Sequence, residues 1–587
     1  MMLQALIAYA ERNELGDADF EKVSVRWQIP LDHAGNLAGG PIPLSENPGD
    51  KKPKPKQMLR PFTSPNELNQ GTKSHFLCDT LERAALFLDP KAEEKAGARR
   101  IQHGYFQALL TEAAVACPDD APRLQGVLSF LNNAEMLAEL HRQLALLKAK
   151  PSDNALFAVD GQDLLDSESL KTFWRNRRHR SAASETKRGL RVCIATGELA
   201  ETLDTTEKIK GVPGGLATGT NLISFDKDSF CSFGLDQAQN AALSAPAELK
   251  IRASLNALIE KSREQRLVFN DTVHLHWTRK PIEYDPIDLL ANADENAIAE
   301  LLKSIQSGQP PVRLEDNYYL MSLSGNGARI VVRDWLESTV PEINQHVAEW
   351  FQDLCIVSPD GVGMKRDFKF YALLYSLVRT ELAELPPQIP TQLLYGALRG
   401  RSIPLPQSAL AGALRRQQLD QENKLNPARI GIIKACLIRS PNNSNDNHHR
   451  TTQTMTEHLN LESKDSAYLC GRLFAVFDRL QYLALGQVGA GVAERYYASA
   501  SVTPALVMGR LFRNAQFHLA KAGGGVAENV RKDFEEISCA LGEQFRPTLT
   551  LEEQGRFALG YYHQKAEHRR RSTERKEQQA AETTDQN

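Results

Sequence analysis

Residues 208–230 have the sequence KIKGVPGGLATGTNLISFDKDSF, in which two lysines precede a glycine-rich loop and a short apolar run follows it. Glycines let the backbone come close to a phosphate, and successive N–H groups can form an anion-binding nest. The glycines could equally do no more than supply the positive φ angles of a wide hairpin loop. The residues that would take part in a phosphate contact are Lys208, Lys210, Gly211, Gly214, Gly215, Thr218, Thr220 and Asn221.

Motifs of nucleotide and metal chemistry do not fit this sequence. A P-loop places lysine and Ser/Thr directly after its last glycine, and residues 210–215 (KGVPGG) are followed by Leu-Ala. A dinucleotide fingerprint needs another glycine spacing and a helix that follows it. His274 and His276 lie two apart on an alternating stretch without a nearby carboxylate or cysteine, which favours half-buried core histidines over metal ligands. We therefore predict no catalytic residue, no bound metal and no cofactor.

The composition is that of an ordinary globular protein. The chain has 587 residues, of which 42% are hydrophobic and 24% charged, enough for two to four domains. No apolar run is long enough to span a bilayer, and residues 1–17 are typical of an amphipathic helix rather than a signal peptide. Eight cysteines without paired spacing favour the reducing cytosol. We expect a cytoplasmic protein that does not contact a membrane.

Positive charge gathers in three segments although the formal net charge is only −3. Residues 171–191 hold eight Lys/Arg against one acidic residue, residues 51–60 hold five against none, and residues 399–450 hold nine against three. Such local excess favours contact with a polyanion, while solvated surface loops are the alternative for any one segment. The supporting cations next to the glycine loop are Arg175, Arg177, Arg178 and Arg180.

Periodicity predicts an α+β protein, with a mixed α/β N-terminal body and an all-α C-terminal bundle. Strands are expected over 222–225, 271–277 and 318–335, the last with a Gly-Asn-Gly turn. The proline-rich segment 384–390 is the predicted linker. The expected domains are residues 1–150 (α/β with a basic loop), 151–385 (strand-rich with the glycine loop) and 386–587 (helical bundle), with a disordered tail after 568.

A second candidate binding segment is Lys73–Ser74–His75. We expect a helix to begin here, with serine as its cap and a cation and an imidazole beside it, an arrangement suited to an anion. An ordinary helix cap without a ligand is an equally good interpretation.

Several separated segments together resemble the large subunit of the type I-C CRISPR Cascade, the Csd family. They are KIKGVPGG with the LISFDKDSFCSFGLDQAQNAALS that follows, MLQALIAYAER, LSGNGARIVVRDWLE (323–337), NPARIGIIKACLIR (426–439), YLCGRLFAVFDRLQ (468–481), RYYASASVTPALV (495–507) and LGYYHQK (559–565). They occur in the order of that family and extend over nearly the whole chain.

The resemblance implies a DNA-binding subunit of a crRNA-guided complex. The expected partners are crRNA, double-stranded target DNA with its PAM, the displaced single strand, the backbone, guide-end and small Cascade subunits, and a helicase-nuclease recruited in trans. Lys208–Thr220 would hold backbone phosphates, while Lys73, Ser74 and His75 would approach PAM base edges. His75 stands where many relatives are expected to carry asparagine, so the PAM preference can differ.

The resemblance also bears on the C-terminal bundle. The residues that would follow the displaced strand are Arg472, Arg479, Arg495, Tyr496, Arg510 and Arg513. Residues 451–587 hold 17 basic and 17 acidic residues, so pairing within the chain is the alternative. The family makes a small subunit by internal translation, for which Met455 is the candidate start, with a small-subunit-like region from about 455.

Two other functions remain open from the sequence. One is an endoribonuclease that trims the guide RNA, which would need a His/Lys/Tyr acid–base group near the glycine loop. The other is a scaffold that assembles the complex without recognising the PAM.

Overall fold

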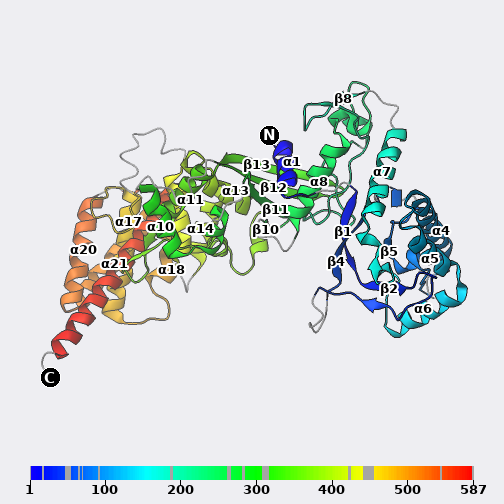
Figure 1. The fold of residues 1–587 in the computed structure, drawn as a ribbon. Coiled ribbons are helices and arrows are strands. Elements are labelled where there is room, and N and C mark those ends of the chain that lie inside the picture. The colour runs from blue at the N-terminus through cyan, green and yellow to red at the C-terminus, as the bar shows by residue number, and fades with distance from the viewer. Residues whose placement is uncertain are drawn as a thin grey trace. The chain divides into compact units, whose positions relative to one another are not determined.

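The computed structural model describes residues 2–15, 19–46, 54–63, 67–68, 71–89, 93–185, 190–225, 227–260, 266–280, 285–306, 316–420, 425–440, 455–542 and 545–584. The chain divides into two compact units (Figure 1). Unit 1 comprises residues 1–267, 273–275 and 321–335, and unit 2 comprises the remainder. This division does not coincide with the predicted domain boundaries near residues 150 and 385.

Unit 1 contains a five-stranded sheet covered by helices. Its strands are β2 (Trp27–Leu31), β3 (Ile42–Pro43), β5 (Cys78–Thr80), β6 (Asn154–Val159) and β7 (Gln162–Asp163), with β3-β2-β6-β5 as the main order. The helices beside it in Figure 1 are α4 (Glu93–Ala116), α5 (Ala121–Asn132) and α6 (Ala134–Leu146). The apolar strand β6 is buried because Phe157 meets Phe106 and Phe130 from the helices, with ring centroids 6.4 and 6.1 Å away.

Unit 1 contains further helices and strands outside the five-stranded sheet. They are α1 (Met2–Arg12), β1 (Phe20–Val25), β4 (Lys56–Pro61), α3 (Leu81–Ala84), α7 (Glu168–Glu185), β8 (Arg191–Val192), β9 (Leu199–Ala200) and α8 (Ala245–Ile259). The strands β1 and β4 pair antiparallel, as do β8 and β9. The hydroxyl of Ser254 on α8 donates to the Leu6 carbonyl of α1 at 2.7 Å, which fixes the first helix on α8.

A four-stranded sheet confirms two of the predicted strand regions. Its order is β10 (Arg266–Phe269), β11 (Thr272–Thr278), β12 (Asn317–Asn326) and β13 (Arg329–Thr339). The predicted Gly-Asn-Gly turn joins β12 to β13, with Gly327 at φ +59°. The strand expected over 222–225 is wrong: only Asn221 forms a β-bridge, to Arg329, and the chain then turns.

Unit 2 is mainly helical, which together with the mixed N-terminal body confirms the α+β class. Its elements are α9 (Pro286–Asn292), α10 (Glu295–Gln306), α11 (Val340–Leu354), β14 (Ile356–Val357), β15 (Met364–Lys365), α12 (Phe370–Tyr375), α13 (Gln388–Leu398), α14 (Gln407–Leu419), α15 (Pro427–Ile438), α17 (Ser466–Leu485), α18 (Val492–Val502), α19 (Pro504–Lys521), α20 (Gly525–Leu541) and α21 (Leu551–Thr584). The predicted linker 384–390 leads directly into α13, and Pro390 is buried there.

Glycines bring α17 and α21 into backbone contact. A Cβ on Gly471 would lie 2.0 Å from the Phe557 carbonyl oxygen, and one on Gly560 would lie 2.1 Å from the Tyr468 carbonyl oxygen. Both distances are far below van der Waals contact, so no side chain fits at either position. The centre of the bundle therefore depends on two glycines facing the opposite helix.

The tail predicted to be disordered after residue 568 is helical as far as Thr584, because α21 continues through it. Ion pairs one helical turn apart stabilise this part of α21: Arg571 pairs with Glu567, and Arg570 pairs with Glu574. Nearer its start, Gly555 of α21 faces Leu437 and Ile433 of α15. Among the described residues, no helix combines the length and apolar character needed to cross a membrane.

We expect Gly471→Ala to destabilise the bundle by about 1–3 kcal/mol, because the methyl group has no space against α21. Gly509→Ala on α19 is the matched control: nothing lies within 4 Å of its added Cβ, so helix propensity should make the change neutral or stabilising by up to about 1 kcal/mol. Hydrogen exchange of the α17 and α21 amides measures both effects. Equal protection in the two variants would contradict the close approach.

Candidate nucleic-acid interface

The glycine loop is a hairpin loop closed by one pair of residues. Ile209 and Thr220 form an antiparallel bridge in which each N–H donates to the other carbonyl at 2.8 Å. Between them, Gly211 and Gly214 have φ angles of +81° and +73°, and Gly219 has +101°. These left-handed angles require glycine, so the loop geometry alone explains three of the glycines.

The hairpin tip between β12 and β13 holds this loop in place. The Gly325 N–H donates to the Pro213 carbonyl at 2.7 Å, and the Asn221 N–H donates to the Ala328 carbonyl at 2.8 Å. A Cβ on Gly325 would lie 2.1 Å from the Gly215 nitrogen. The loop is therefore fixed on a sheet by backbone contacts.

The predicted side chains of the loop divide into two groups. The Thr220 hydroxyl donates to the Ile209 carbonyl at 3.3 Å, and the Asn221 amide donates to the Thr206 carbonyl at 2.7 Å, so both serve the loop itself. Lys208 is half-buried and Lys210 is exposed, and neither side chain forms an ion pair or hydrogen bond with a described residue.

The backbone around these lysines is also open to solvent. Gly211, Gly214 and Thr218 are exposed, and Gly215 is half-buried against the hairpin tip. The loop thus presents uncompensated positive charge beside accessible backbone, which is what a phosphate contact requires.

The segment Lys73–Ser74–His75 is not the helix N-terminus that the sequence analysis predicted. It leads into strand β5, and the helix that follows is α3, which begins at Leu81 with Thr80 as an N-cap that makes no side-chain hydrogen bond. The Asp79 carboxylate accepts instead from the His75 N–H at 2.8 Å, and Leu77 has φ +60°. The segment therefore leads into an edge strand of the sheet and does not cap a helix.

Ser74 and His75 lie in the interior, with 0% and 5% of their surface exposed. Within the part of the chain that the structure describes, the Ser74 hydroxyl and the His75 Nδ1 have no hydrogen-bond partner. Lys73 is more accessible, but its Nζ pairs with Glu67 at 2.7 Å. Contact of Ser74 or His75 with a base would require residues 73–77 to move.

Electrostatics connect this segment to the glycine loop. Burial, and then the charges of Arg60, Arg83 and Lys210, hold the pKa of His75 well below its usual value. His75 is therefore neutral, able to donate from one ring nitrogen and accept at the other. Lys210 is therefore close enough for its charge to act on His75, and both residues belong to unit 1.

The arginines of α7 are largely engaged inside the protein. The Arg177 Nε pairs with Glu112 at 2.9 Å, and the Arg178 Nε pairs with Asp19 at 3.1 Å. The Arg175 guanidinium lies over a phenylalanine ring, 5.2 Å from the centroid. The side chain of Arg180 lies outside the described residues. Two of the four supporting cations are thus neutralised by carboxylates, which weakens their predicted role.

The candidates in the bundle also separate by exposure. Arg472 is buried to 1% exposure, with its Nε donating to the Gln564 side chain at 3.0 Å, so it cannot contact a strand on the surface. Its position on the stripe of α17 that faces α21 explains this burial. By contrast, Arg495, Arg510 and Arg513 are exposed. Tyr496 is half-buried, and the Arg510 guanidinium lies over its ring, 5.7 Å from the centroid. Arg479 donates to the Ser572 hydroxyl.

The two strand histidines are buried in the core, and among the described residues the Nε2 of His276 has no hydrogen-bond partner. The His274 Nδ1 lies 2.7 Å from the Ser322 hydroxyl, and the His276 Nδ1 lies 2.9 Å from the Asp285 carboxylate. Within the described ranges, no three His, Cys, Asp or Glu residues come together as a metal site.

A comparison with known protein families identifies the family of this chain. A family model described as CRISPR-associated protein (Cas_Csd1) matches residues 6–569. The chain belongs to the Csd1 family. As a Csd1 protein it is the large subunit of a type I-C Cascade and works with the other Cascade subunits. The comparison with curated proteins gives no match.

Sequence reasoning missed the hairpin tip as the partner of the glycine loop. The sequence pattern predicts only a turn at Gly325 and Gly327, although their segment, LSGNGARI, is among those that resemble the Csd family. A glycine that needs no positive φ, such as Gly325, is a signal for close approach of another backbone.

We expect Lys210→Ala to raise the pKa of His75, because a positive charge that disfavours the imidazolium is removed. Lys208→Ala is the matched control, since Lys208 is not among the charges that act on His75. A pH titration of histidine ring resonances by NMR, with His75 assigned by substitution, measures both. An unchanged His75 titration in Lys210→Ala would show that the two segments are not neighbours.

Proposed function

We propose that this Csd1 subunit recognises the PAM of double-stranded DNA in a crRNA-guided surveillance complex. It would help to open the duplex and form the R-loop, hold the displaced strand, and offer a platform to a helicase-nuclease recruited in trans. The subunit itself would break no bond and would use no cofactor.

The observation that carries the proposal is the pair of lysines on a fixed loop. Lys208 and Lys210 keep their charge uncompensated by the described residues, while neighbouring cations such as Arg177 and Arg178 are paired. A cation without a partner on an immobile backbone is suited to a phosphate, since little conformational entropy is lost on binding.

Base recognition would come second, through residues 73–77. Neutral His75 can donate and accept at a base edge, but it is buried, so the segment has to move for contact. Leu77 at φ +60° is an unusual conformation for a bulky residue, which favours such a rearrangement. The proposal is therefore that phosphate binding at Lys210 precedes exposure of His75.

The displaced strand would follow α18 and α19. Arg495, Arg510 and Arg513 are exposed there, and Tyr496 offers a ring for stacking once Arg510 moves aside. Arg472 takes no part because it is buried.

We expect Lys210→Ala to weaken duplex binding by the assembled complex to a similar extent for every PAM sequence. One phosphate contact fewer should also reduce the slope of log K against log salt by about one unit. Lys171→Ala on α7 removes the same charge from a residue already paired with Glu168, and should leave the slope unchanged. Binding titrations at several salt concentrations provide the measurement. An identical slope for the native chain and Lys210→Ala would refute the phosphate contact.

We expect His75→Ala to lose discrimination by about 1–3 kcal/mol at one PAM base pair, because a base contact is removed. A PAM-library binding assay on the complex gives the specificity directly. Since His75 is buried, thermal unfolding of the same variant separates misfolding from lost recognition. A folded variant with unchanged PAM preference, together with salt-dependent binding that ignores the PAM, would instead favour the scaffold function.

A further inference from the structure

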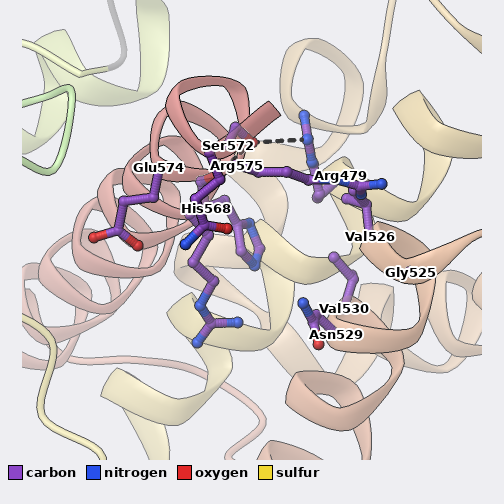
Figure 2. A pocket seen from close by; sticks show the side chains of 11 residues that line it. Arg479, Gly525, Val526, Asn529, Val530, His568, Ser572, Glu574 and Arg575 are labelled. Atoms are coloured by element: carbon purple, nitrogen blue, oxygen red, sulfur yellow. Dashed lines mark hydrogen bonds between the residues drawn. The ribbon is translucent and has the colours of Figure 1, made fainter. Parts of the chain in front are cut away.

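A pocket of about 400 Å³ lies in unit 2 between α17, α20 and α21 (Figure 2). Arg479 contributes from α17, the first residues of α20 form one wall, and residues 568–578 of α21 form another. The volume lies in the range of small-molecule sites and exceeds that of a single phosphate group. An occupant can therefore be a phosphate attached to a larger group.

The pocket holds positive charge that the protein does not neutralise. Arg479 donates to the Ser572 hydroxyl at 3.2 Å, and neither Arg479 nor Arg575 pairs with a carboxylate of the described residues. Arg571 differs, since it pairs with Asp533 at 2.9 Å. The one carboxylate of the lining, Glu574, is bound to Arg570, and Figure 2 shows it directed away from Arg479.

The N-terminus of α20 faces the same space. Its N-cap is Gly524, which has no side chain that could accept from the first N–H groups, and Gly525 and Val526 line the pocket. An added Cβ on Gly524 or Gly525 would meet nothing within 4 Å, so the backbone there is open. The first N–H groups of a 17-residue helix thus add donors and a partial positive charge to those of the arginines.

A buried imidazole supplies an independent sign that a ligand belongs here. His568 lines the pocket with only 6% of its surface exposed, and no described residue forms a hydrogen bond with its Nδ1. The His568 Nε2 lies 3.2 Å from the Asp533 carboxylate and 3.2 Å from the Gln564 amide nitrogen, which itself donates to Asp533 at 3.3 Å. A carboxylate can only accept, so the contact with Asp533 favours the hydrogen on Nε2 and leaves Nδ1 as an acceptor. A buried acceptor without a donor is costly unless a ligand supplies one, such as a phosphate hydroxyl or a nucleotide amino group.

We propose that this pocket binds a phosphate group, held by Arg479, Arg575 and the α20 N-terminus, with His568 Nδ1 accepting a hydrogen bond from the ligand. The phosphate comes either from single-stranded nucleic acid or from a free phosphate compound. Only the nucleic-acid source rests on the displaced-strand function proposed above.

Calorimetric titration of the full chain with inorganic phosphate, and separately with a short oligo-dT strand, tests the pocket. Arg575→Gln and Arg479→Gln should each weaken binding roughly tenfold or more, because a charged hydrogen bond is lost. Lys576→Gln is the matched control: it removes the same charge from the next residue of α21, which does not line the pocket, and should change affinity less than about twofold. The ring ¹⁵N resonances of His568 should shift on addition of phosphate.

The two probes identify the source. Binding of oligo-dT that depends on both arginines, with inorganic phosphate as a competitor, assigns the pocket to a nucleic-acid phosphate. Arginine-dependent binding of inorganic phosphate without competition by oligo-dT assigns it to a free phosphate compound. Absence of saturable binding for both probes, or affinities unaffected by both arginine substitutions, would overturn the pocket. Because PAM-dependent duplex binding is measured through Lys210, either proposal can fail while the other stands.

Discussion

Backbone contact between the glycine loop and the β12–β13 tip is the constraint on which the candidate interface depends. Gly325 and Gly215 approach so closely that neither a side chain nor a water molecule fits between them. The contact fixes the loop on a sheet and so fixes the positions of Lys208 and Lys210. The bundle uses the same device at Gly471 and its partner glycine on α21. In both units, these glycines allow two backbones to pack against each other, and this close packing matters more than the flexibility of glycine.

The distribution of charge follows from which cations are buried. Arg178 pairs with Asp19, and Arg472 donates to Gln564. Both arginines lie in segments predicted to contact nucleic acid, but their charges are used inside the protein, because a guanidinium removed from water needs fixed partners. Among the described residues, the cations without a carboxylate partner include Lys208 and Lys210 on the glycine loop, and Arg479 and Arg575 beside the α20 N-terminus. A nearly neutral protein can therefore present concentrated positive charge at a few places, which is consistent with the nucleic-acid contact proposed above.

The sequence predicted the α+β class and the strand hairpin well, because hydrophobic periodicity depends only on local burial. It failed at Lys73–His75, where a sheet edge and a helix bury similar apolar patterns. It also failed for the tail after residue 568, whose stability comes from contacts and ion pairs that composition does not reveal. The exposed position of Lys210 could be inferred from the glycine-rich loop that follows it. The burial of Ser74 and the engagement of Arg178 depend on long-range packing that no local pattern encodes.

The seam between α15 and α21 has a consequence for any shorter product of this chain. A polypeptide that started at Met455 would contain α17 to α21 but would lack α15, whose Leu437 and Ile433 lie against Gly555. The surface of α21 around Gly555, which α15 covers in the full-length chain, would then be exposed to solvent. It would be stable only if another protein surface covered it. The full-length and short forms would thus differ in what they can dock against, even though they share the same helices.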